Sequence, residues 1–227
     1  MADQNYAEQN TVSAENQLRV NDYVSIVSRG GNKKVLFFGN SITRHAPKAD
    51  IGWHGDWGMA ASCPENDYVH IVVDFLDKKF GIVDYCIAQG STWERGYFKG
   101  ESILEEYYSS ARDFCADIVI IRIGENMKAA DLEKVDCKPY FDMAIKFLVS
   151  NPEAKVILTD NFWYSELIYD YTKSIANENG YIFCPIGDLC DDESTMAIGL
   201  FEHHGVSIHP CDKGMRLIAE RIIACLE

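Results

Sequence analysis

The sequence contains no long apolar stretch, and its longest purely aliphatic run is Ile118–Ile121. A membrane-spanning helix needs roughly 20 apolar residues in succession, so none is expected. Basic residues are also scarce: 21 Lys and Arg stand against 35 Asp and Glu, giving a formal net charge of −14. Nucleic acids and anionic membranes are bound through basic surfaces, so the composition argues against both as partners.

Three further patterns are absent: paired cysteines of the Cys-x-x-Cys type, Asn-x-Ser/Thr acceptors and a basic, apolar leader at the first residues. The eight cysteines are scattered along 227 residues. A chain of this length buries roughly 70% of its unfolded surface without cross-links. We therefore expect free thiols and a cytoplasmic location, with secretion as the alternative if a leader has been removed.

Two regions differ in composition. Residues 1–31 are polar and rich in Asn, Gln and Glu, and within them Tyr23–Val27 can form a short strand. From residue 32 onward, short apolar runs alternate with segments whose apolar residues recur at helical spacing. The sequence thus predicts an N-terminal extension over residues 1–31 and one folded domain over residues 32–227.

Within that domain, five short apolar runs indicate strands, at residues 35–38, 82–88, 118–121, 156–158 and 181–184. Helical stripes separate most of these runs, and a further stripe over residues 215–226 indicates a C-terminal helix. Strands that alternate with helices form a parallel sheet between two helix layers. We therefore predict an α/β fold with a five-stranded parallel sheet, whose ligands bind at the carboxyl ends of the strands.

The loops at these strand ends carry the residue types that acyl transfer needs. Ser41 follows the first strand, Gly90 the second and Asn126 the third, while His209 precedes the last helix. Acyl transfer requires a hydroxyl nucleophile, a base that takes its proton and hydrogen-bond donors for the developing oxyanion. A histidine, with an unperturbed pKa near 6.5, suits the base.

These segments resemble the scattered sequence blocks of the SGNH (GDSL-type) hydrolases, a flavodoxin-like esterase superfamily. Gly39–Thr43 is similar to the first block, Gly-Asp-Ser-Ile, with Asn40 in place of Asp. Gly90 falls at the glycine of the second block, Gly124-x-Asn126 resembles the third, and His209-Pro210 resembles the fifth. The resemblance runs from about residue 33 to the C-terminus. It implies a flavodoxin-like three-layer fold and an SGNH-hydrolase-like catalytic domain over residues 32–227.

The resemblance also implies roles for these residues. Ser41 is the expected nucleophile, and His209 is the expected general base and then general acid. The amides of Ser41 and Gly90, with the side chain of Asn126, are the expected oxyanion hole. The implied activity is that of a carboxylic ester hydrolase that removes small acyl groups, acetyl above all, through an acyl-serine intermediate.

One position departs from the family pattern. Family members carry an Asp three residues before the catalytic His, and this sequence has Val206 there. Either another acid orients the imidazole, or a backbone carbonyl fixes its tautomer and leaves a Ser–His dyad. Glu202 is the first candidate for that acid, and Asp188 is a weaker one.

Aromatic residues are frequent in the strand-end loops. Trp53 and Trp57 lie in a Gly-rich loop after Ser41, and Trp163 follows the fourth strand. Aromatic faces stack well on sugar rings, so we predict that these three residues bind substrate; packing of the loop is the alternative. Because family members deacetylate plant polysaccharides, an acetylated carbohydrate is the expected substrate.

Other functions remain open. A lipase or thioesterase would use the same chemistry, and a family member without catalysis would be consistent with Val206. A non-catalytic flavodoxin-like binding module would hold a nucleotide or flavin, but the sequence has no Gly-rich phosphate-binding motif. No cofactor is expected, and no metal site, because His203, His204, His209 and Cys211 match no zinc spacing. The sequence gives no oligomeric state.

Overall fold

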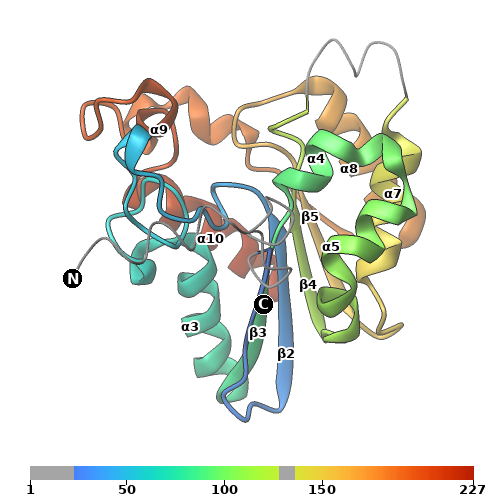
Figure 1. The fold of residues 1–227 in the computed structure, drawn as a ribbon. Helices are drawn as coiled ribbons and strands as arrows, with labels where there is room; N and C mark the ends of the chain where they lie inside the picture. Colours follow the sequence, from blue (N-terminus) through green and yellow to red (C-terminus); the bar gives the residue numbers. More distant parts are fainter. Residues whose placement is uncertain (1–22, 128–135) are drawn as a thin grey trace, which may run out of the picture.

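A computed structural model describes residues 23–127 and 136–227, and its centre is one six-stranded sheet (Figure 1). The strands are β1 (Val24–Val27), β2 (Lys33–Gly39), β3 (Val83–Gln89), β4 (Ile118–Arg122), β5 (Lys155–Thr159) and β6 (Ile182–Cys184). Their order across the sheet is β1-β3-β2-β4-β5-β6. Strands β2 to β6 are parallel neighbours in the order of flavodoxin-like folds. The prediction of five parallel strands is confirmed.

The sixth strand, β1, lies at one edge of the sheet and pairs antiparallel with β3. Val24 is buried, whereas Ile26 is 45% exposed, as expected for a short strand at an edge. The predicted sheet therefore lacked one strand, which comes from the region assigned to the N-terminal extension. Residues 1–22 of that extension lie outside the described residues.

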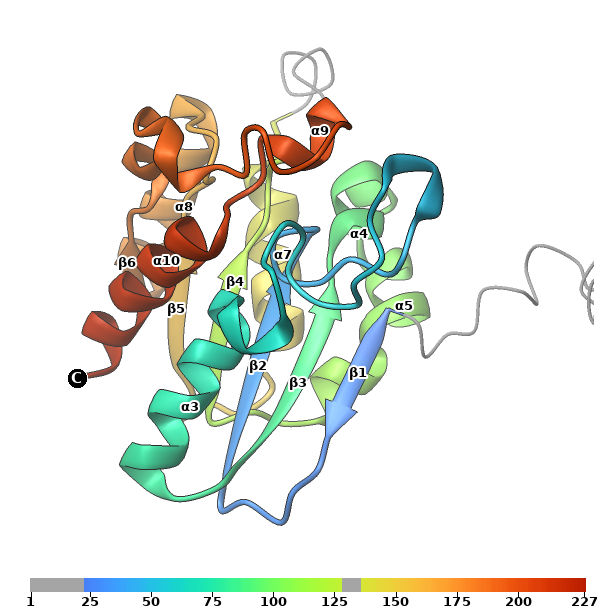
Figure 2. The ribbon, with the colours of Figure 1, turned by 90° about the vertical axis from the view of Figure 1, so that its left-hand side faces the viewer.

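Helices cover both faces of the sheet. The α-helices are α3 (Tyr68–Phe80), α4 (Ser91–Gly96), α5 (Glu101–Asp113), α7 (Lys138–Leu148), α8 (Glu166–Asn179), α9 (His204–Ser207) and α10 (Asp212–Leu226). Short 3₁₀ helices are η2 (Ala49–Ile51), η3 (Pro64–Asn66), η4 (Tyr97–Lys99), η5 (Gly187–Asp191) and η6 (Glu193–Thr195). Helices α3 and α10 lie on one face of the sheet, and α5, α7 and α8 lie on the other (Figure 2).

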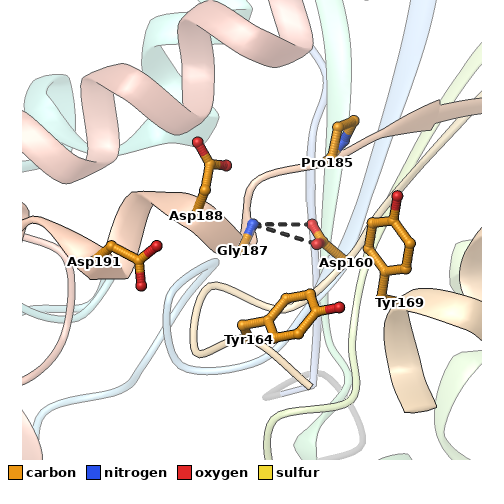
Figure 3. Close-up of a pocket in the computed structure, with 7 residues that line it drawn as sticks. All are labelled: Asp160, Tyr164, Tyr169, Pro185, Gly187, Asp188 and Asp191. Carbon is orange, nitrogen blue, oxygen red and sulfur yellow. Dashed lines mark hydrogen bonds between the residues drawn. The ribbon is translucent and has the colours of Figure 1, made fainter. Parts of the chain in front are cut away.

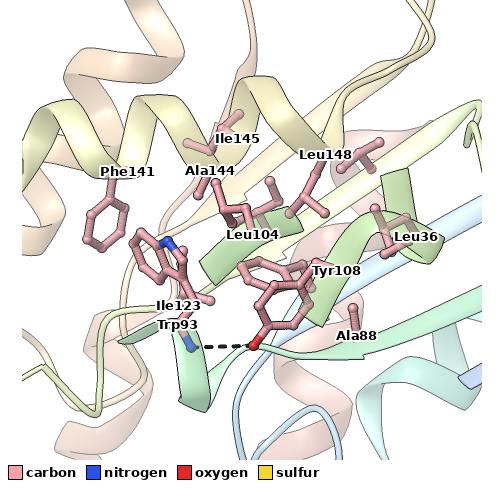
Figure 4. Close-up of a cluster of buried hydrophobic side chains, with 14 of the residues drawn as sticks. Leu36, Ala88, Trp93, Leu104, Tyr108, Ile123, Phe141, Ala144, Ile145 and Leu148 are labelled. Carbon is pink, nitrogen blue, oxygen red and sulfur yellow. Dashed lines mark hydrogen bonds between the residues drawn. The ribbon is translucent and has the colours of Figure 1, made fainter. Parts of the chain in front are cut away.

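The two layers of core follow from the apolar stripes of these helices. On the α5–α7–α8 side, Trp93, Tyr108 and Phe141 form the aromatic centre of a cluster of buried side chains (Figure 4). The Trp93 and Phe141 rings meet edge to face at 5.1 Å. Burying side chains of this size contributes about 1.5–3 kcal/mol each.

Among the helices that the structure describes, none has the length and the apolar composition of a membrane-spanning segment.

Parallel pairing brings the strand-end loops together. Gly39, the last residue of β2, is in register with Gln89 of β3 and with Arg122 of β4. The residues that follow all three strands therefore leave the sheet at the same end, where the carboxyl ends of the strands lie. This register is what places Ser41, Gly90 and Asn126 in one region of the molecule.

Candidate active site

Ser41 is presented by a tight turn at the carboxyl end of β2. The amides of Thr43 and Arg44 donate to the Asn40 carbonyl at 2.9 and 3.0 Å, which closes the turn. A side chain at position 39 would collide with the Thr43 hydroxyl and the Arg122 carbonyl, so the turn requires Gly39. Ser41 is half-buried, and its hydroxyl contacts His209.

His209 meets Ser41 although 168 residues separate them in sequence. Its Nε2 lies 2.8 Å from the Ser41 Oγ, and its Nδ1 lies 2.6 Å from the carbonyl oxygen of Gly205. A carbonyl only accepts, so Nδ1 carries the proton and donates it to Gly205. Nε2 is then unprotonated and accepts from the Ser41 hydroxyl. This is the arrangement of a Ser–His dyad whose tautomer is fixed by the backbone.

The surroundings of His209 keep its imidazole neutral. Burial lowers the pKa of His209 to about 4, against the opposing effect of its bond to the Gly205 carbonyl. The Trp163 ring closes one side of the imidazole, with ring centroids 5.0 Å apart in an edge-to-face contact. At neutral pH the ring is therefore in the form that accepts a proton.

Asn126 follows β4 and lies beside the pair. Together with Ser41 and His209 it lines a cavity of about 330 Å³. The Asn126 Nδ2 donates one hydrogen bond to Glu94 Oε2 at 2.5 Å, and its second N–H is left for a ligand. Within the described residues, the Ser41 amide N–H has no partner in the protein, so it is also available.

Gly90 does not fit its predicted place in the oxyanion hole. Its amide N–H donates to the Gly39 carbonyl at 2.6 Å, continuing the β2–β3 ladder past the last paired residues. The prediction placed Gly90 correctly at the strand end, but the direction of its N–H depends on the sheet register. In this structure that donor is already engaged.

A buried polar network that the sequence did not predict lies beneath Ser41 and Asn126. Glu94, from α4, is 1% exposed and accepts from the Gly124 amide as well as from Asn126. The Asn40 Nδ2 donates to Glu94 at 3.0 Å and to Glu125 at 2.5 Å. Burial raises the pKa of Glu94, the nearby Glu125 carboxylate raises it further, and the three N–H donors act in the opposite direction.

Arg122, the last residue of β4, supplies the positive charge of this network. Its guanidinium is fully buried and donates to Glu125 and to the Oδ1 of Asn40. Asn40 therefore accepts from a cation and donates to two carboxyl groups through one side chain. An Asp at this position has no N–H for either glutamate, which gives a physical reason for the departure from the family's Gly-Asp-Ser-Ile block.

The structure does not bring Glu202 to His209. Glu202 is exposed and lines a different cavity with residues of the Ala49–Gly52 loop, while Nδ1 is occupied by the Gly205 carbonyl. Asp188 is bound to Arg221 instead. The predictions of Glu202 and Asp188 as the acid are therefore wrong. Glu202 precedes His209 by seven residues, and the path of the loop between them cannot be inferred from that spacing.

Trp53 and Trp57 also lie elsewhere than predicted. Their rings contact each other at 5.6 Å, the Trp53 Nε1 donates to the His45 carbonyl at 2.9 Å, and the Trp57 Nε1 donates to Ala61 at 2.8 Å. Among the described residues that line the Ser41 cavity there is no tryptophan. Packing of the loop, the alternative interpretation, is what the structure shows for these two. Trp163 instead contacts His209.

Another cavity, of about 380 Å³, lies at the carboxyl end of β5 and is separate from the Ser41 cavity (Figure 3). It is lined by Asp160, Tyr164, Tyr169, Pro185, Gly187, Asp188 and Asp191. The Asp160 carboxylate accepts from the amides of Ile186 and Gly187, so it is occupied by backbone donors. This cavity contains none of the Ser41, His209 and Asn126 side chains. In the described ranges, no three His, Cys, Asp or Glu side chains gather as metal ligands would.

Comparison with known proteins shows which solved structures share this fold. No protein-family model matches the chain, and no curated relative was found. A two-domain esterase active on acetylated mannans, co-crystallised with mannopentaose, superposes with a TM-score of 0.56 at 19% identity, over 86% of this chain and 48% of that one. The chain thus spans about half the length of that esterase.

Two further structures agree. A family two carbohydrate esterase from Clostridium thermocellum, in complex with cellohexaose, has a TM-score of 0.54 at 14% identity, over 87% of this chain and 64% of that one. A GDSL-like lipase from Parabacteroides merdae has a TM-score of 0.53 at 15% identity, over 88% and 97%. These neighbours are two carbohydrate-active esterases and a GDSL-like lipase, and their likeness confirms the predicted flavodoxin-like fold of a parallel sheet between helix layers.

Proposed function

We propose that this protein is a serine esterase of the SGNH type that removes small acyl groups through an acyl-Ser41 intermediate. One observation carries the proposal. The Ser41 Oγ lies 2.8 Å from an unprotonated His209 Nε2, whose ring is held by the Gly205 carbonyl. A hydroxyl and a neutral imidazole at hydrogen-bond distance, beside a cavity, form an activated nucleophile.

The course of the reaction follows from these positions. His209 Nε2 takes the Ser41 proton as Oγ attacks the ester carbonyl carbon, and the carbonyl oxygen becomes an oxyanion. The intermediate collapses when His209 returns the proton to the departing alcohol, which leaves the acyl group on Ser41. A water molecule then loses a proton to His209 and attacks the acyl carbon. His209 returns that proton to the Ser41 Oγ as the bond between Oγ and the acyl carbon breaks, which releases the carboxylic acid and restores the serine.

The oxyanion is stabilised by the free donors of the cavity. In the part of the chain that the structure describes, the Ser41 amide N–H and the second N–H of Asn126 have no protein partner and are placed beside the Ser41 Oγ to donate to the oxyanion. Losing one such donor typically costs about 2.7–4 kcal/mol of transition-state stabilisation. Because the Gly90 N–H is engaged in the sheet ladder, it has no part in this proposal.

The cavity favours a short acyl group and a polar alcohol. Its volume of about 330 Å³ is at the lower end for ligand pockets. Ile51 and Met59 are the aliphatic side chains among the described residues that line it. A lipase needs a longer apolar surface for its acyl chain, so an acetylated carbohydrate is the better supported substrate. The carbohydrate esterases among the structural neighbours also support a carbohydrate ester as the substrate.

The test is replacement of the nucleophile. Ser41→Ala is expected to abolish hydrolysis of p-nitrophenyl acetate and labelling by a fluorophosphonate probe, while the thermal unfolding midpoint changes little. The matched control is Ser110→Ala, at an exposed serine of α5 that does not line the Ser41 cavity. Activity retained in Ser41→Ala, or absent from the unmodified protein, would refute the proposal.

A further inference from the structure

Two basic side chains line the Ser41 cavity although the chain as a whole is strongly acidic. Lys48 and Arg95 line it, together with the imidazoles of His45 and His203. No Asp or Glu is found among the described residues of this lining. In a chain with 35 acidic and 21 basic residues, such a lining runs against the composition. The two basic side chains are therefore a feature of this lining and do not follow from the overall composition.

The two permanent cations reach the cavity from different elements and leave their charges open to a ligand. Arg95 is an exposed residue of α4, and its Nη2 lies 3.4 Å from the Asn126 Oδ1, directly beside an oxyanion donor. Lys48 comes from the loop after Ser41. Its partner is Asp50 at 3.8 Å, with both side chains more than half exposed. An ion pair of that kind holds a lysine weakly, so a bound anion can replace it.

A concave site with charge of one sign concentrates the potential at its mouth and attracts ligands of the opposite sign. Arginine in particular binds carboxylate and phosphate groups through paired hydrogen bonds. We infer that the ester substrate carries an anionic group, a carboxylate or a phosphate, close to its scissile acyl group, and that Arg95 and Lys48 bind this group. The inference rests on the proposed function, since it names the substrate class of the same site.

The experiment compares pairs of esters, one member with an anionic group and the other with that group masked or absent. The carboxylate arm uses an acetylated oligogalacturonate and the same oligosaccharide after methyl esterification of its carboxylates. The phosphate arm uses acetylated glucose 6-phosphate and acetylated glucose. For each pair the ratio of kcat/KM for the anionic ester to that for the neutral ester is measured at low and at high salt, and p-nitrophenyl acetate serves as a neutral reference.

In at least one arm, the unmodified protein is expected to prefer the anionic ester by about tenfold or more at low salt, less at high salt. Arg95→Gln and Lys48→Gln are each expected to lower this ratio several-fold. Lys155→Gln removes the same charge at the opposite, amino-terminal end of β5 and is expected to leave the ratio unchanged. The ratio is the readout because a purely structural effect of a substitution lowers both rates together.

Three outcomes overturn the inference. A ratio near one in both arms, with p-nitrophenyl acetate still hydrolysed, refutes the anionic substrate and leaves the esterase proposal standing. A preference that survives both Arg95→Gln and Lys48→Gln, or that falls equally in Lys155→Gln, refutes the assignment to these side chains. Failure of the unmodified protein to hydrolyse any of the five esters refutes the proposed function and this inference with it.

Discussion

The two sides of the Ser41 hydroxyl are built in opposite ways. On the oxyanion side, Asn126 is held by Glu94, which belongs to a buried network with Asn40, Glu125 and Arg122. On the other side, His209 is held by one backbone carbonyl in a four-residue helix, with no carboxylate on its Nδ1. Charged groups thus stabilise the position of a neutral amide, whereas the base is kept neutral by burial.

The difference predicts how sensitive the oxyanion side and the His209 side are to substitution. A buried ion network is stable only while every member has a partner, because each unpaired charge retains its full desolvation cost. A ring held by a backbone carbonyl depends on the fold of its loop and not on any one side chain. Substitutions should therefore have large effects on the network and small effects around Nδ1.

The largest effect is expected from Arg122→Met. It removes the cation that faces Glu125 and leaves the Asn40 Oδ1 without its donor. Loss of one partner from a buried ion pair costs about 3–5 kcal/mol, so the free energy of unfolding should fall by that amount. Urea denaturation measures it, with Arg112→Met, at a partly exposed guanidinium of α5, as the control. Equal stability of the two variants would contradict the account of the network.

A smaller effect is expected from Glu94→Gln. All three neighbours of the Glu94 carboxyl donate N–H groups, and a glutamine must turn its own NH₂ toward at least one of them. A hydrogen bond to a charged group is worth about 1.5–3 kcal/mol, so kcat should fall roughly 10- to 100-fold as Asn126 loses its support. KM should change little. A loss in KM alone, with kcat unchanged, would show that Glu94 does not position Asn126.

The smallest effect is expected from Glu202→Gln. Because the Gly205 carbonyl occupies Nδ1 and Glu202 is exposed, kcat/KM for p-nitrophenyl acetate should stay within about twofold of the unmodified protein, the range of ordinary surface substitutions. A loss of a hundredfold or more would restore Glu202 as the acid of a triad and overturn the dyad.

The same contrast explains what could be predicted from the sequence. Ser41 and His209 could be singled out because they lie next to elements with a clear apolar pattern, and parallel strands bring their carboxyl ends together. Their roles were predicted from the resemblance to the SGNH sequence blocks. The five parallel strands, β2 to β6, were predicted from their apolar runs. Strand β1 was expected as a short strand over Tyr23–Val27 but was not assigned to the sheet, because it lies in the polar N-terminal region and outside the alternation of apolar runs and helical stripes.

The sequence could not show in which direction a backbone N–H points or which polar side chains are buried. Whether the Gly90 N–H points into the site or into the sheet depends on register, and register is a property of two strands. Glu94 and Arg122 look like surface residues in a sequence, and only the fold shows that they are buried together. Their residue type and their loop after Ser41 predict that Trp53 and Trp57 bind substrate, yet the two rings contact each other.

The central claim is that a neutral His209, held by a carbonyl, activates Ser41. The rate at which a fluorophosphonate labels Ser41, followed against pH, tests it without any assumption about the natural substrate. Because the neutral imidazole is the active form, the rate should rise with pH through an apparent pKa of about 4, that of the buried ring, and be level through neutral pH. A rise centred near the ordinary histidine value of about 6.5, or labelling elsewhere than on Ser41, would contradict it.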